Sequence, residues 1–373
     1  MRSASTLQGA VTDFAVVVRA RADGRRLSCA AMMIVDKGAV APGGLAVTDS
    51  NDARGLAGLG FPQGWFQVAY SADLVEGAVV PLRYFGRDLV LFRTESGTAQ
   101  LLDAYCAHLG THLGLGGRVD GECLRCPFHA WAFDTQGVCV DIPYAERIPR
   151  GAQVAAWPTR EHSGIVFAWY SPHGADPEWE PPELEEHGDP AWVGYRRDRF
   201  VFRSAVQEVI ENVFDVPHGQ YVHDNAQGNA PAVASFGFEA HRAEAVFELD
   251  LPLVGGTTRH VVTLHGPGIA VNRSTGRGSK AFFSTYTPIE VDVVEANFSF
   301  MTPRSTPDDP TGERSLQSAN ATARLFEQDI PIWEHKIHRR TPLLCDGDGE
   351  LRRFRVWVRQ FAPDTAPTDG RPA

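Results

Sequence analysis

The chain has 373 residues, a formal net charge of −11 and a pI of about 5.6. This length suggests two or three domains, and the acidic balance argues against binding to nucleic acid or to an anionic membrane surface. No stretch approaches the ~18 consecutive apolar residues that a spanning helix needs, so we expect no membrane span and a cytoplasmic protein.

The N-terminal residues 1–56 are rich in Ala, Gly and Arg and show little hydrophobic periodicity. We expect a poorly defined extension there, and Met32 or Met33 leaves open a later start of translation. From Gly64 onward, short apolar runs broken by Gly and Asp predict strands.

A stretch rich in proline and carboxylates, residues 171–192, predicts a linker. The chain before it, residues 57–172, is expected to form a small all-β domain. The remainder, residues 173–373, is expected to form a second domain, because it mixes strand and helix patterns.

Three long apolar runs in the second domain predict an antiparallel sheet. These runs are residues 259–274, 280–291 and 293–303. Residues 312–340 have the pattern of a long helix, although Pro331 is expected to kink or restart it. The final apolar run, residues 352–361, is predicted as a further strand or helix.

Six cysteines occur, and four of them lie close together in the first domain. These four are Cys106, Cys123, Cys126 and Cys139. Disulfide frameworks belong to short secreted chains, whereas clustered cysteines in a long chain of a reducing compartment favour metal binding. We therefore expect a metal site rather than disulfides in this region.

Two short motifs in this region each offer one thiolate and one imidazole. Cys106 lies two residues before His108, and Cys126 lies three residues before His129, with 17 residues between His108 and Cys126. The set could hold tetrahedral zinc, or a [2Fe–2S] cluster with both cysteines on one iron and both histidines on the other. The short Cys-x-His spacing favours the cluster, because zinc fingers usually pair like ligands.

The arrangement of the cysteines as a whole also favours an iron–sulfur cluster over a zinc site. A zinc site built on the Cys-x-x-Cys of Cys123 and Cys126 would leave Cys106 or a histidine unused. A proline and a tryptophan flank the second motif and could shield a cluster from water. Cys123 and Cys139 are therefore predicted to be small buried residues, and His112 a loop residue rather than a ligand.

The segments CAHLG and CPFHAW resemble the Rieske iron–sulfur motif. The resemblance implies that the cluster ligands are Cys106, His108, Cys126 and His129. Ala130 departs from the pattern, because many relatives carry glycine at this position. Thr111 and Phe128 stand where respiratory-type Rieske proteins carry an extra pair of cysteines, so the motif is similar to the oxygenase type.

A second pair of histidines lies in the segment VIENVFDVPHGQYVHD of the second domain. His218 and His223 are five residues apart, which on a regular helix would place their side chains about 140° apart. Both can reach one metal only if the helix is distorted or ends, and Pro217 and Gly219 would permit this. The alternative to a shared metal site is that both histidines are simply exposed to solvent.

Two histidines and one carboxylate can form a facial triad that leaves positions on Fe(II) open for O2. About a hundred residues further on, Asp329 lies in an apolar helical stretch. Glu327 and Glu334 are rival candidates for the carboxylate ligand, and spacing alone does not choose among the three.

The segment ENVFDVPHGQYVH resembles the mononuclear iron motif of Rieske non-haem iron oxygenases, and EQDIPIWEHK resembles the segment that donates the carboxylate in their short members. The resemblance implies that His218, His223 and Asp329 bind iron. It also implies that Asp215 bridges the two metal centres of neighbouring subunits. The similarity covers about residues 60–340 and is greatest to the 3-ketosteroid 9α-hydroxylase oxygenases and the sterol 7-desaturases.

This resemblance implies an α+β protein, with an N-terminal all-β Rieske domain and a catalytic domain of helix-grip, START-like fold. It further implies a homotrimer in which a ferredoxin or flavin reductase, drawing on NAD(P)H, supplies electrons to the Rieske [2Fe–2S] cluster and then to a mononuclear Fe(II). With O2, the enzyme is expected to hydroxylate or desaturate a hydrophobic, steroid- or sterol-like polycycle. Five aromatic residues are expected to line an apolar cavity for it or simply to form core. They are Phe282, Phe283, Tyr286, Phe298 and Phe300.

Other functions stay open. The oxygenase could tailor a specialised metabolite or an arylamine. A Rieske-type electron carrier without oxygenase activity would belong to another class, but the second metal motif and the large second domain argue against it. An aromatic-ring dihydroxylating α subunit is disfavoured, because in those proteins the carboxylate usually lies farther from the histidines.

Overall fold

The computed structural model describes residues 54–223, 232–250, 257–276, 278–307 and 309–363. The predicted N-terminal extension, residues 1–56, falls almost entirely outside these ranges. None of the helices in the described ranges has the length and apolar character that a bilayer crossing requires.

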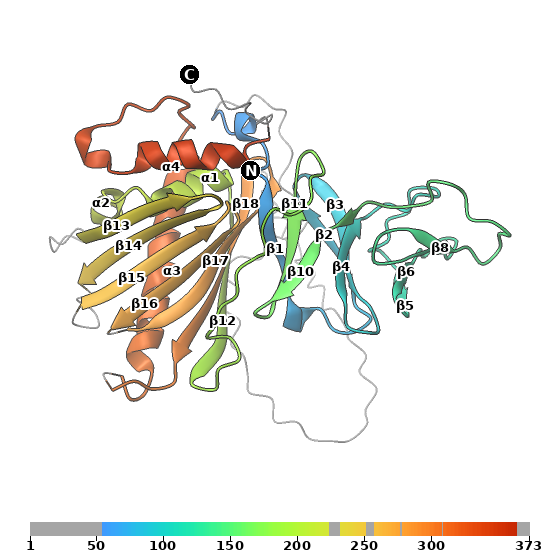
Figure 1. Cartoon of the computed structure of the whole chain (residues 1–373), viewed down its shortest axis with the longest axis horizontal. Coiled ribbons are helices and arrows are strands. Elements are labelled where there is room, and N and C mark those ends of the chain that lie inside the picture. The colour runs from blue at the N-terminus through green and yellow to red at the C-terminus, as the bar shows by residue number, and fades with distance from the viewer. Residues whose placement is uncertain (1–53, 224–231, 251–256, 277, 308, 364–373) are drawn as a thin grey trace, which may run out of the picture. The chain divides into compact units, whose positions relative to one another are not determined.

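The described residues up to Tyr170 form three small antiparallel sheets (Figure 1). The strands are β1 Gly64–Tyr70, β2 Val79–Tyr84, β3 Arg87–Arg93, β4 Ala99–Asp103, β5 Arg118–Asp120, β6 Cys123–Arg125, β7 Ala132–Phe133, β8 Cys139–Asp141, β9 Ala156–Trp157, β10 Thr159–His162 and β11 Ile165–Tyr170. The sheet orders are β1-β11-β10, β2-β3-β4-β9 and β5-β6-β7-β8. The only helices in residues 54–170 are the short 3-10 turns η1 Ala57–Leu59 and η2 Ser71–Asp73, so the all-β prediction is confirmed.

The described residues from Trp192 onward form one large antiparallel sheet with helices. Its seven strands are β12 Trp192–Phe202, β13 Ala232–Glu239, β14 Arg242–Asp250, β15 Thr257–His265, β16 Ile269–Gly276, β17 Lys280–Glu290 and β18 Val293–Pro303, in the order β12-β18-β17-β16-β15-β14-β13. The helices are α1 Val206–Ile210, η3 Glu211–Val213, α2 His218–Tyr221, α3 Glu313–His335, η4 Asp346–Asp348, α4 Leu351–Val358 and η5 Arg359–Phe361. The predicted α+β class and antiparallel sheet are confirmed.

The long helix α3 packs on one face of this sheet, against β12, β17 and β18 (Figure 1). The expectation that the helix restarts at Pro331 is wrong, because α3 continues through it to His335. A kink at Pro331 stays a prediction. Proline has no N–H, so Pro331 makes no hydrogen bond to the carbonyl four residues before it, and α3 lacks one intrahelical bond there. The helix also ends before the predicted Arg340, because Lys336 turns into an extended conformation to pair with Glu208.

The last apolar run of the chain is a helix rather than a strand. In α4, the buried residues are Leu351, Phe354, Trp357 and Val358, a spacing that puts them on one helical face. Phe354 stacks on Phe214 at 5.0 Å between ring centroids. This face therefore covers the segment that leads to the two histidines.

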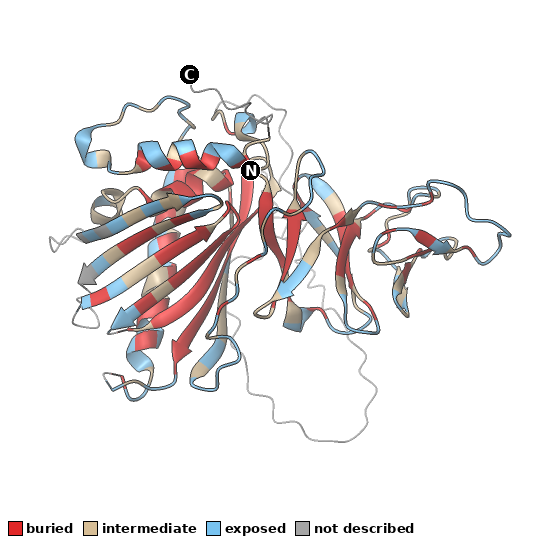
Figure 2. Ribbon diagram, viewed as in Figure 1, coloured by how far each residue is buried: buried red, intermediate tan, exposed pale blue. Residues whose placement is uncertain are grey.

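Strands β17 and β18 are buried on both faces along most of their length (Figure 2). Phe282, Phe298 and Phe300 pack in the core cluster that includes residues of α3. Phe283, by contrast, packs on the opposite face with β1 and β11 residues. Burial on both sides explains why these runs are apolar with only partial alternation. All five aromatic residues considered for a cavity are at most 6% exposed and pack as core.

The first domain joins the sheet through polar as well as apolar contacts. Thr285 Oγ1 donates to Gln67 Oε1 at 2.8 Å, and Thr287 Oγ1 donates to the Gln67 carbonyl at 2.7 Å. The hydroxyls of Tyr70 and Ser299 lie 2.9 Å apart. Where β16, β17 and β18 meet the first domain, their outer face is thus covered by β1 rather than by solvent.

Candidate metal centres

Two tight loops carry the first candidate centre. The loop after β4 is closed by the Cys106 N–H, which donates to the Thr111 carbonyl at 2.9 Å. The Gly110 N–H returns to the Cys106 carbonyl at 3.0 Å. The loop between β6 and β7 is closed in the same way, since the Cys126 N–H donates to the Trp131 carbonyl at 2.9 Å. Each loop holds one cysteine and one histidine in a fixed backbone conformation.

The structure brings the four predicted cluster ligands together. Cys106 and Cys126 are buried, at 3% and 2% exposure, and their thiols lie within hydrogen-bonding reach of each other. The rings of His108 and His129 lie 4.8 Å apart between centroids. His129 Nδ1 is buried and has no hydrogen-bond partner among the described residues. Two adjacent thiols, two adjacent imidazoles and an unpaired ring nitrogen fit a Rieske cluster.

Electrostatics and packing support this fit. Burial, together with the neighbouring Cys126 thiol, raises the pKa of the Cys106 thiol to about 11. A metal reverses such a shift, because a bound cation stabilises thiolates. Trp131 stacks on His108 at 4.6 Å between centroids and donates from Nε1 to the Tyr144 hydroxyl at 2.9 Å. The tryptophan thus covers one imidazole, as its position beside the motif suggests.

Ala130 has a φ of 59°, in the left-handed region that favours glycine. Its N–H donates to the Cys126 carbonyl at 3.1 Å, and its carbonyl accepts from Arg125 Nη1 at 3.0 Å. Arg125 in turn pairs with Asp141 at 2.7 Å. The turn therefore holds this conformation against the steric cost of a methyl group, a cost that glycine would not have.

The other cysteines and His112 lie outside the donor set. Cys139 is buried in the core cluster of the first domain, as predicted, whereas Cys123 is only partly buried. His112 Nδ1 accepts a hydrogen bond from the Gly114 N–H at 3.1 Å. His112 is therefore a hydrogen-bonded loop residue, as expected.

The second candidate centre joins two segments of the catalytic domain. His218 is the first residue of α2, and this helix ends at Tyr221, before His223. Because the helix stops, the two rings lie 5.1 Å apart between centroids instead of diverging. Asp329 comes from the buried face of α3. The ligand atoms of these three residues all lie within 4.8 Å of one another.

Of the three rival carboxylates, the geometry favours Asp329. It is 6% exposed, its Oδ2 lies 3.6 Å from His223 Nε2, and its Oδ1 has no partner among the described residues. Glu334 is engaged elsewhere, since its Oε1 accepts the Arg203 N–H at 3.3 Å. Within the described part of the chain, the metal-ligand set at this place includes Asp329 and neither glutamate.

The charges of this centre fit a cation. The pKa of Asp329 is raised to about 6, mainly by burial and also by the Asp215 carboxylate, although His218 and Asn212 act to lower it. Burial lowers the pKa of His223, and the neighbouring His218 lowers it further. A neutral imidazole and a buried carboxylate that lacks a partner are what a divalent metal binds.

Both imidazoles are oriented from behind through Nδ1. His218 Nδ1 lies against the Asp215 carbonyl, and His223 Nδ1 lies 3.1 Å from Gln328 Oε1. These contacts leave Nε2 of each ring for a metal, as is usual for histidine ligands. Gln328 could not be found from the sequence, because its partner lies 105 positions away in the chain.

Asn212 lies within the segment ENVFDVPHGQYVH, but the sequence alone predicts no role for it. Its Oδ1 accepts from Trp333 Nε1 at 3.4 Å, and its side chain lowers the pKa of Asp329. It therefore ties the histidine segment to α3 beside the carboxylate.

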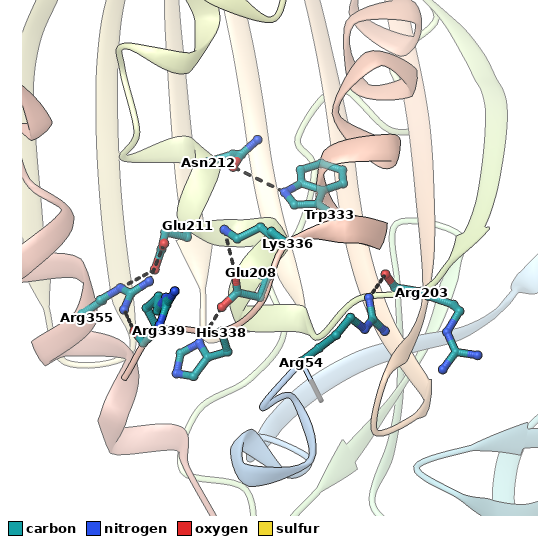
Figure 3. A network of polar contacts seen from close by, with 10 residues as sticks. All are labelled: Arg54, Arg203, Glu208, Glu211, Asn212, Trp333, Lys336, His338, Arg339 and Arg355. Carbon is teal, nitrogen blue, oxygen red and sulfur yellow. Dashed lines mark hydrogen bonds and ion pairs between the residues drawn. The ribbon is translucent and has the colours of Figure 1, made fainter. Parts of the chain in front are cut away.

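A buried polar network holds the two segments of this centre together (Figure 3). Glu208, fully buried in α1, pairs with Lys336 Nζ and with His338 Nδ1, each at 2.6 Å. Glu211 accepts two hydrogen bonds from Arg355 of α4, at 2.7 and 2.8 Å. The segment that precedes His218 is thus bonded to the chain that follows Asp329 and to α4.

In sequence comparison, each half of the chain matches the model of a known domain family. A sequence model described as the Rieske [2Fe-2S] domain matches residues 64–158. A second, described as the 3-ketosteroid 9alpha-hydroxylase C-terminal domain, matches residues 168–362. Together with the fold and the two donor sets, these matches define a Rieske-type oxygenase.

Curated relatives agree with both matches. A probable 3-ketosteroid-9-alpha-monooxygenase, oxygenase component, from Rhodococcus rhodochrous is 32% identical over 346 residues, which cover 85% of each chain. Cholesterol 7-desaturase nvd from Drosophila melanogaster is 32% identical over 327 residues, covering 81% of this chain and 75% of the relative. The chain belongs to the 3-ketosteroid 9α-hydroxylase family of Rieske non-haem iron oxygenases.

Solved structures support the fold. Dicamba monooxygenase bound to dicamba superposes with a TM-score of 0.61 at 20% identity, covering 80% of this chain and 96% of that one. NdmA of Pseudomonas putida CBB5 gives 0.64 at 18% identity, covering 83% and 92%. As a member of its family, the protein is an oxidoreductase that contains a Rieske [2Fe–2S] cluster and mononuclear iron, uses O2 and receives electrons from a partner protein.

Proposed function

We propose that this chain is the terminal oxygenase that hydroxylates or desaturates a hydrophobic, steroid- or sterol-like polycycle. The observation that carries the proposal is the convergence of His218, His223 and Asp329, whose ligand atoms lie within 4.8 Å of one another. Three such protein ligands leave positions on bound Fe(II) open for O2, which is the chemistry that the iron supplies. The names of the steroid and sterol relatives support the substrate class.

The residues around the second centre prepare it for the metal. The Asp215 carbonyl and Gln328 fix the two imidazoles through Nδ1. The raised pKa of Asp329, caused mainly by burial, reflects a carboxylate that no described donor stabilises fully. A cation at this place relieves that cost, so metal binding and the native arrangement support each other.

We assign the cluster to Cys106, His108, Cys126 and His129. For electron transfer, we propose that the Asp215 carboxylate connects the cluster of one subunit to the iron of the next, since a carboxylate can accept from two imidazole N–H groups. Asp215 is partly buried, and its charge is felt by Asp329.

A homotrimer would place the two centres of neighbouring subunits close together. Beside the cluster motif, three large apolar side chains are exposed in the single chain. Leu109 is 65% exposed, Phe128 61% and Tyr144 62%. Groups of exposed apolar side chains are typical of contact surfaces. Burial of the two cluster loops against a neighbouring subunit would cover these three side chains. A ferredoxin or flavin reductase that draws on NAD(P)H is the proposed electron donor.

We also propose the domain limits 57–172 and 173–373. The chain between β11 and β12 contains no regular helix or strand, which suits a linker. We place the enzyme in the cytoplasm, where thiols such as those of Cys123 and Cys139, neither of them in a disulfide, stay reduced.

The proposal is tested by product analysis. The anaerobically purified protein, with a surrogate reductase, is offered sterols, 3-ketosteroids, terpenoids and arylamines in air, and products are identified by mass spectrometry. A hydroxylated or dehydrogenated steroid is expected. Oxidation of arylamines or terpenoids with no steroid product would overturn the substrate class.

The ligand assignment has a separate test. Asp329→Ala is expected to lower the iron content from about three to about two per protomer, with unchanged visible absorbance of the cluster. Glu334→Gln, the control, should keep all of the iron, because Glu334 bonds the Arg203 N–H instead. Full iron content in Asp329→Ala would refute the assignment, whatever the substrate proves to be.

A further inference from the structure

Residues 336–361 carry a local positive charge that the acidic balance of the whole chain conceals. They include six arginines and one lysine but only three carboxylates, whereas the full chain has a net charge of −11. Two of these cations are used inside the domain, since Lys336 pairs with Glu208 and Arg355 with Glu211. The other five are arginines, and all of them are exposed.

The outer face of α4 holds part of this charge. Arg352, Val356 and Arg359 follow one another at intervals of four and three residues, which puts them on one side of α4 and of the turn η5 that continues it. All three are exposed, while the opposite side of α4 is buried (Figure 2). Arg353 pairs with Glu350 at 2.9 Å. No carboxylate of the described residues pairs with Arg352 or Arg359.

Two further arginines lie beside α4. Arg355 Nη1 donates to the Arg339 carbonyl, so the chain at Arg339 runs along the flank of the helix (Figure 3). The side chains of Arg339 and Arg340 are exposed, and within the described ranges neither forms an ion pair. Four exposed arginines without a counter-ion in the described chain thus surround one helix. We call this group the basic face: Arg339, Arg340, Arg352 and Arg359.

Apolar side chains are exposed among these arginines. Leu343, three residues after Arg340, is 101% exposed, and Val356 on the outer side of α4 is 65% exposed. Leu344 packs against the core cluster of the catalytic domain, so the chain is anchored beside the exposed leucine. A single exposed apolar residue needs no explanation. Apolar tips among unpaired arginines, however, are typical of a surface that binds at the interface of an anionic bilayer.

An anionic lipid surface fits the basic face better than an acidic electron-donor protein does. An electron donor must approach the cluster, and the cluster loops of the same chain adjoin β5 and β6, at the other end of the described chain from α4 (Figure 1). The helix α4 packs instead on η3 and β13 of the catalytic domain. Charge pairing with an acidic protein gives no role to a fully exposed leucine, whereas a bilayer accepts an apolar tip between its headgroups.

We propose that the basic face docks the protein on an anionic lipid surface, with Leu343 and Val356 entering the headgroup layer. This assignment goes beyond the function proposed above and does not depend on its substrate class. It places the catalytic domain against the lipid, because the buried side of α4 covers the segment that leads to His218. A hydrophobic substrate dissolved in the membrane is then held close to the domain that binds the mononuclear iron.

The test is flotation of the full-length holoenzyme with lipid vesicles. Vesicles of phosphatidylcholine with about one-third phosphatidylglycerol are expected to carry the protein up a density gradient, whereas pure phosphatidylcholine vesicles are not. Each arginine near an anionic surface strengthens binding about 5-fold, so the double variant Arg352→Gln, Arg359→Gln should bind about 25-fold more weakly. Leu343→Ser should bind about 10-fold more weakly, because it removes the apolar group that leaves water.

The double variant Arg147→Gln, Arg150→Gln is the matched control. Both arginines are exposed and lie between β8 and β9 of the first domain, so the variant changes the net charge equally at another place. It should bind anionic vesicles as the wild type does. An equal loss in both double variants would show that net charge alone acts, and a wild type that does not float would show that no docking occurs. Either result overturns the assignment.

Two further measurements on Arg352→Gln, Arg359→Gln distinguish the rival occupants. Sedimentation velocity should give the same assembly as the wild type. A smaller assembly would make the basic face a contact between copies of this chain and overturn the lipid assignment. Reduction of the cluster by the surrogate reductase should proceed at the wild-type rate. Slower reduction with unchanged vesicle binding would assign the face to the electron donor instead. Absence of any steroid product would overturn the proposed function and leave vesicle binding as it is.

Discussion

Ala130 shows how one residue can be strained by the site that it serves. Its φ of 59° is imposed by the turn that brings Cys126 and His129 to the cluster position. For a residue with a Cβ, the left-handed region costs about 1–2 kcal/mol. A glycine at this position would remove that strain. The gain in stability would be partly offset, because glycine has more conformational entropy than alanine in the unfolded chain.

We therefore predict that Ala130→Gly stabilises the cluster loop by up to about 1 kcal/mol. Visible absorbance of the cluster should be lost at a higher temperature than in the wild type. Ala240→Gly is the control, since Ala240 also has a positive φ, 44°, but lies in the turn between β13 and β14. It should leave the stability of the cluster loop unchanged. Earlier loss of absorbance in Ala130→Gly would contradict the strain argument.

At the residue scale, motifs predict ligands that are close in sequence and fail for those that are not. Cys106 and His108 are recognisable because one loop carries both. The choice of Asp329 over Glu327 and Glu334 required the resemblance, and in the structure it follows from the direction in which each side chain leaves α3. Gln328 carries no signal of its own, because its partner His223 is brought to it only by tertiary packing.

At the scale of elements, the strands and helices follow from apolar patterning, but their ends do not. The sequence predicts α3 as far as Arg340, whereas the helix stops at His335 because Lys336 and His338 turn to Glu208. A buried carboxylate in another helix, 128 positions from Lys336, thus decides where α3 ends. Local propensity cannot report such a partner.

This role of Glu208 predicts that Glu208→Gln destabilises the protein by about 2 kcal/mol at pH 7, because it removes one partner of buried charge-assisted bonds. Burial alone would raise the pKa of Glu208, but His338 and Lys336 outweigh burial and hold the pKa below its usual value of 4.5. The contribution of the carboxylate is therefore present above about pH 4.5 and is lost as the pH falls further.

Urea unfolding at several pH values measures how much the Glu208 carboxylate contributes to stability. The difference in midpoint between wild type and Glu208→Gln should be large at pH 7 and shrink below pH 4.5. Glu180→Gln provides the control, because the pair of Glu180 with Arg160 is exposed and such pairs contribute little. If the difference in midpoint between wild type and Glu208→Gln did not change with pH, the packing of the side chain rather than its charge would be responsible for the lost stability.

At the scale of the whole molecule, the two domains share a core, which the sequence does not reveal. Alternation along β17 predicts two faces but not that the second face is covered by β1. The register decides this, since Phe283 and Thr285 point toward β1 and β11 residues, whereas Phe282 points toward α3. A linker of about twenty residues suggests independent domains, yet the contacts of Gln67 and Tyr70 bind them to one sheet.

Gly268, in the turn between β15 and β16, makes this close approach possible. A Cβ on Gly268 would lie 2.2 Å from the Trp65 carbonyl oxygen and 2.5 Å from Phe66 Cδ1, both in β1. The Gly268 carbonyl also accepts the Tyr286 N–H at 2.9 Å, so the turn cannot simply move away. Backbone of one domain is thus packed directly on backbone of the other.

We predict that Gly268→Ala costs more than about 2 kcal/mol, near the upper part of the usual range for overpacking, because the obstacle is a backbone oxygen. The loss should fall on the contact between the domains. Unfolding followed separately by cluster absorbance and by far-ultraviolet circular dichroism should therefore change from one shared transition to two. Gly194→Ala, at a position where an added Cβ meets nothing within 4 Å, should keep a single transition at the wild-type midpoint. If Gly268→Ala also unfolds in one transition at that midpoint, β1 and the sheet are not held together by this contact, and the shared core must depend on the hydrogen bonds of Gln67 and Tyr70 instead.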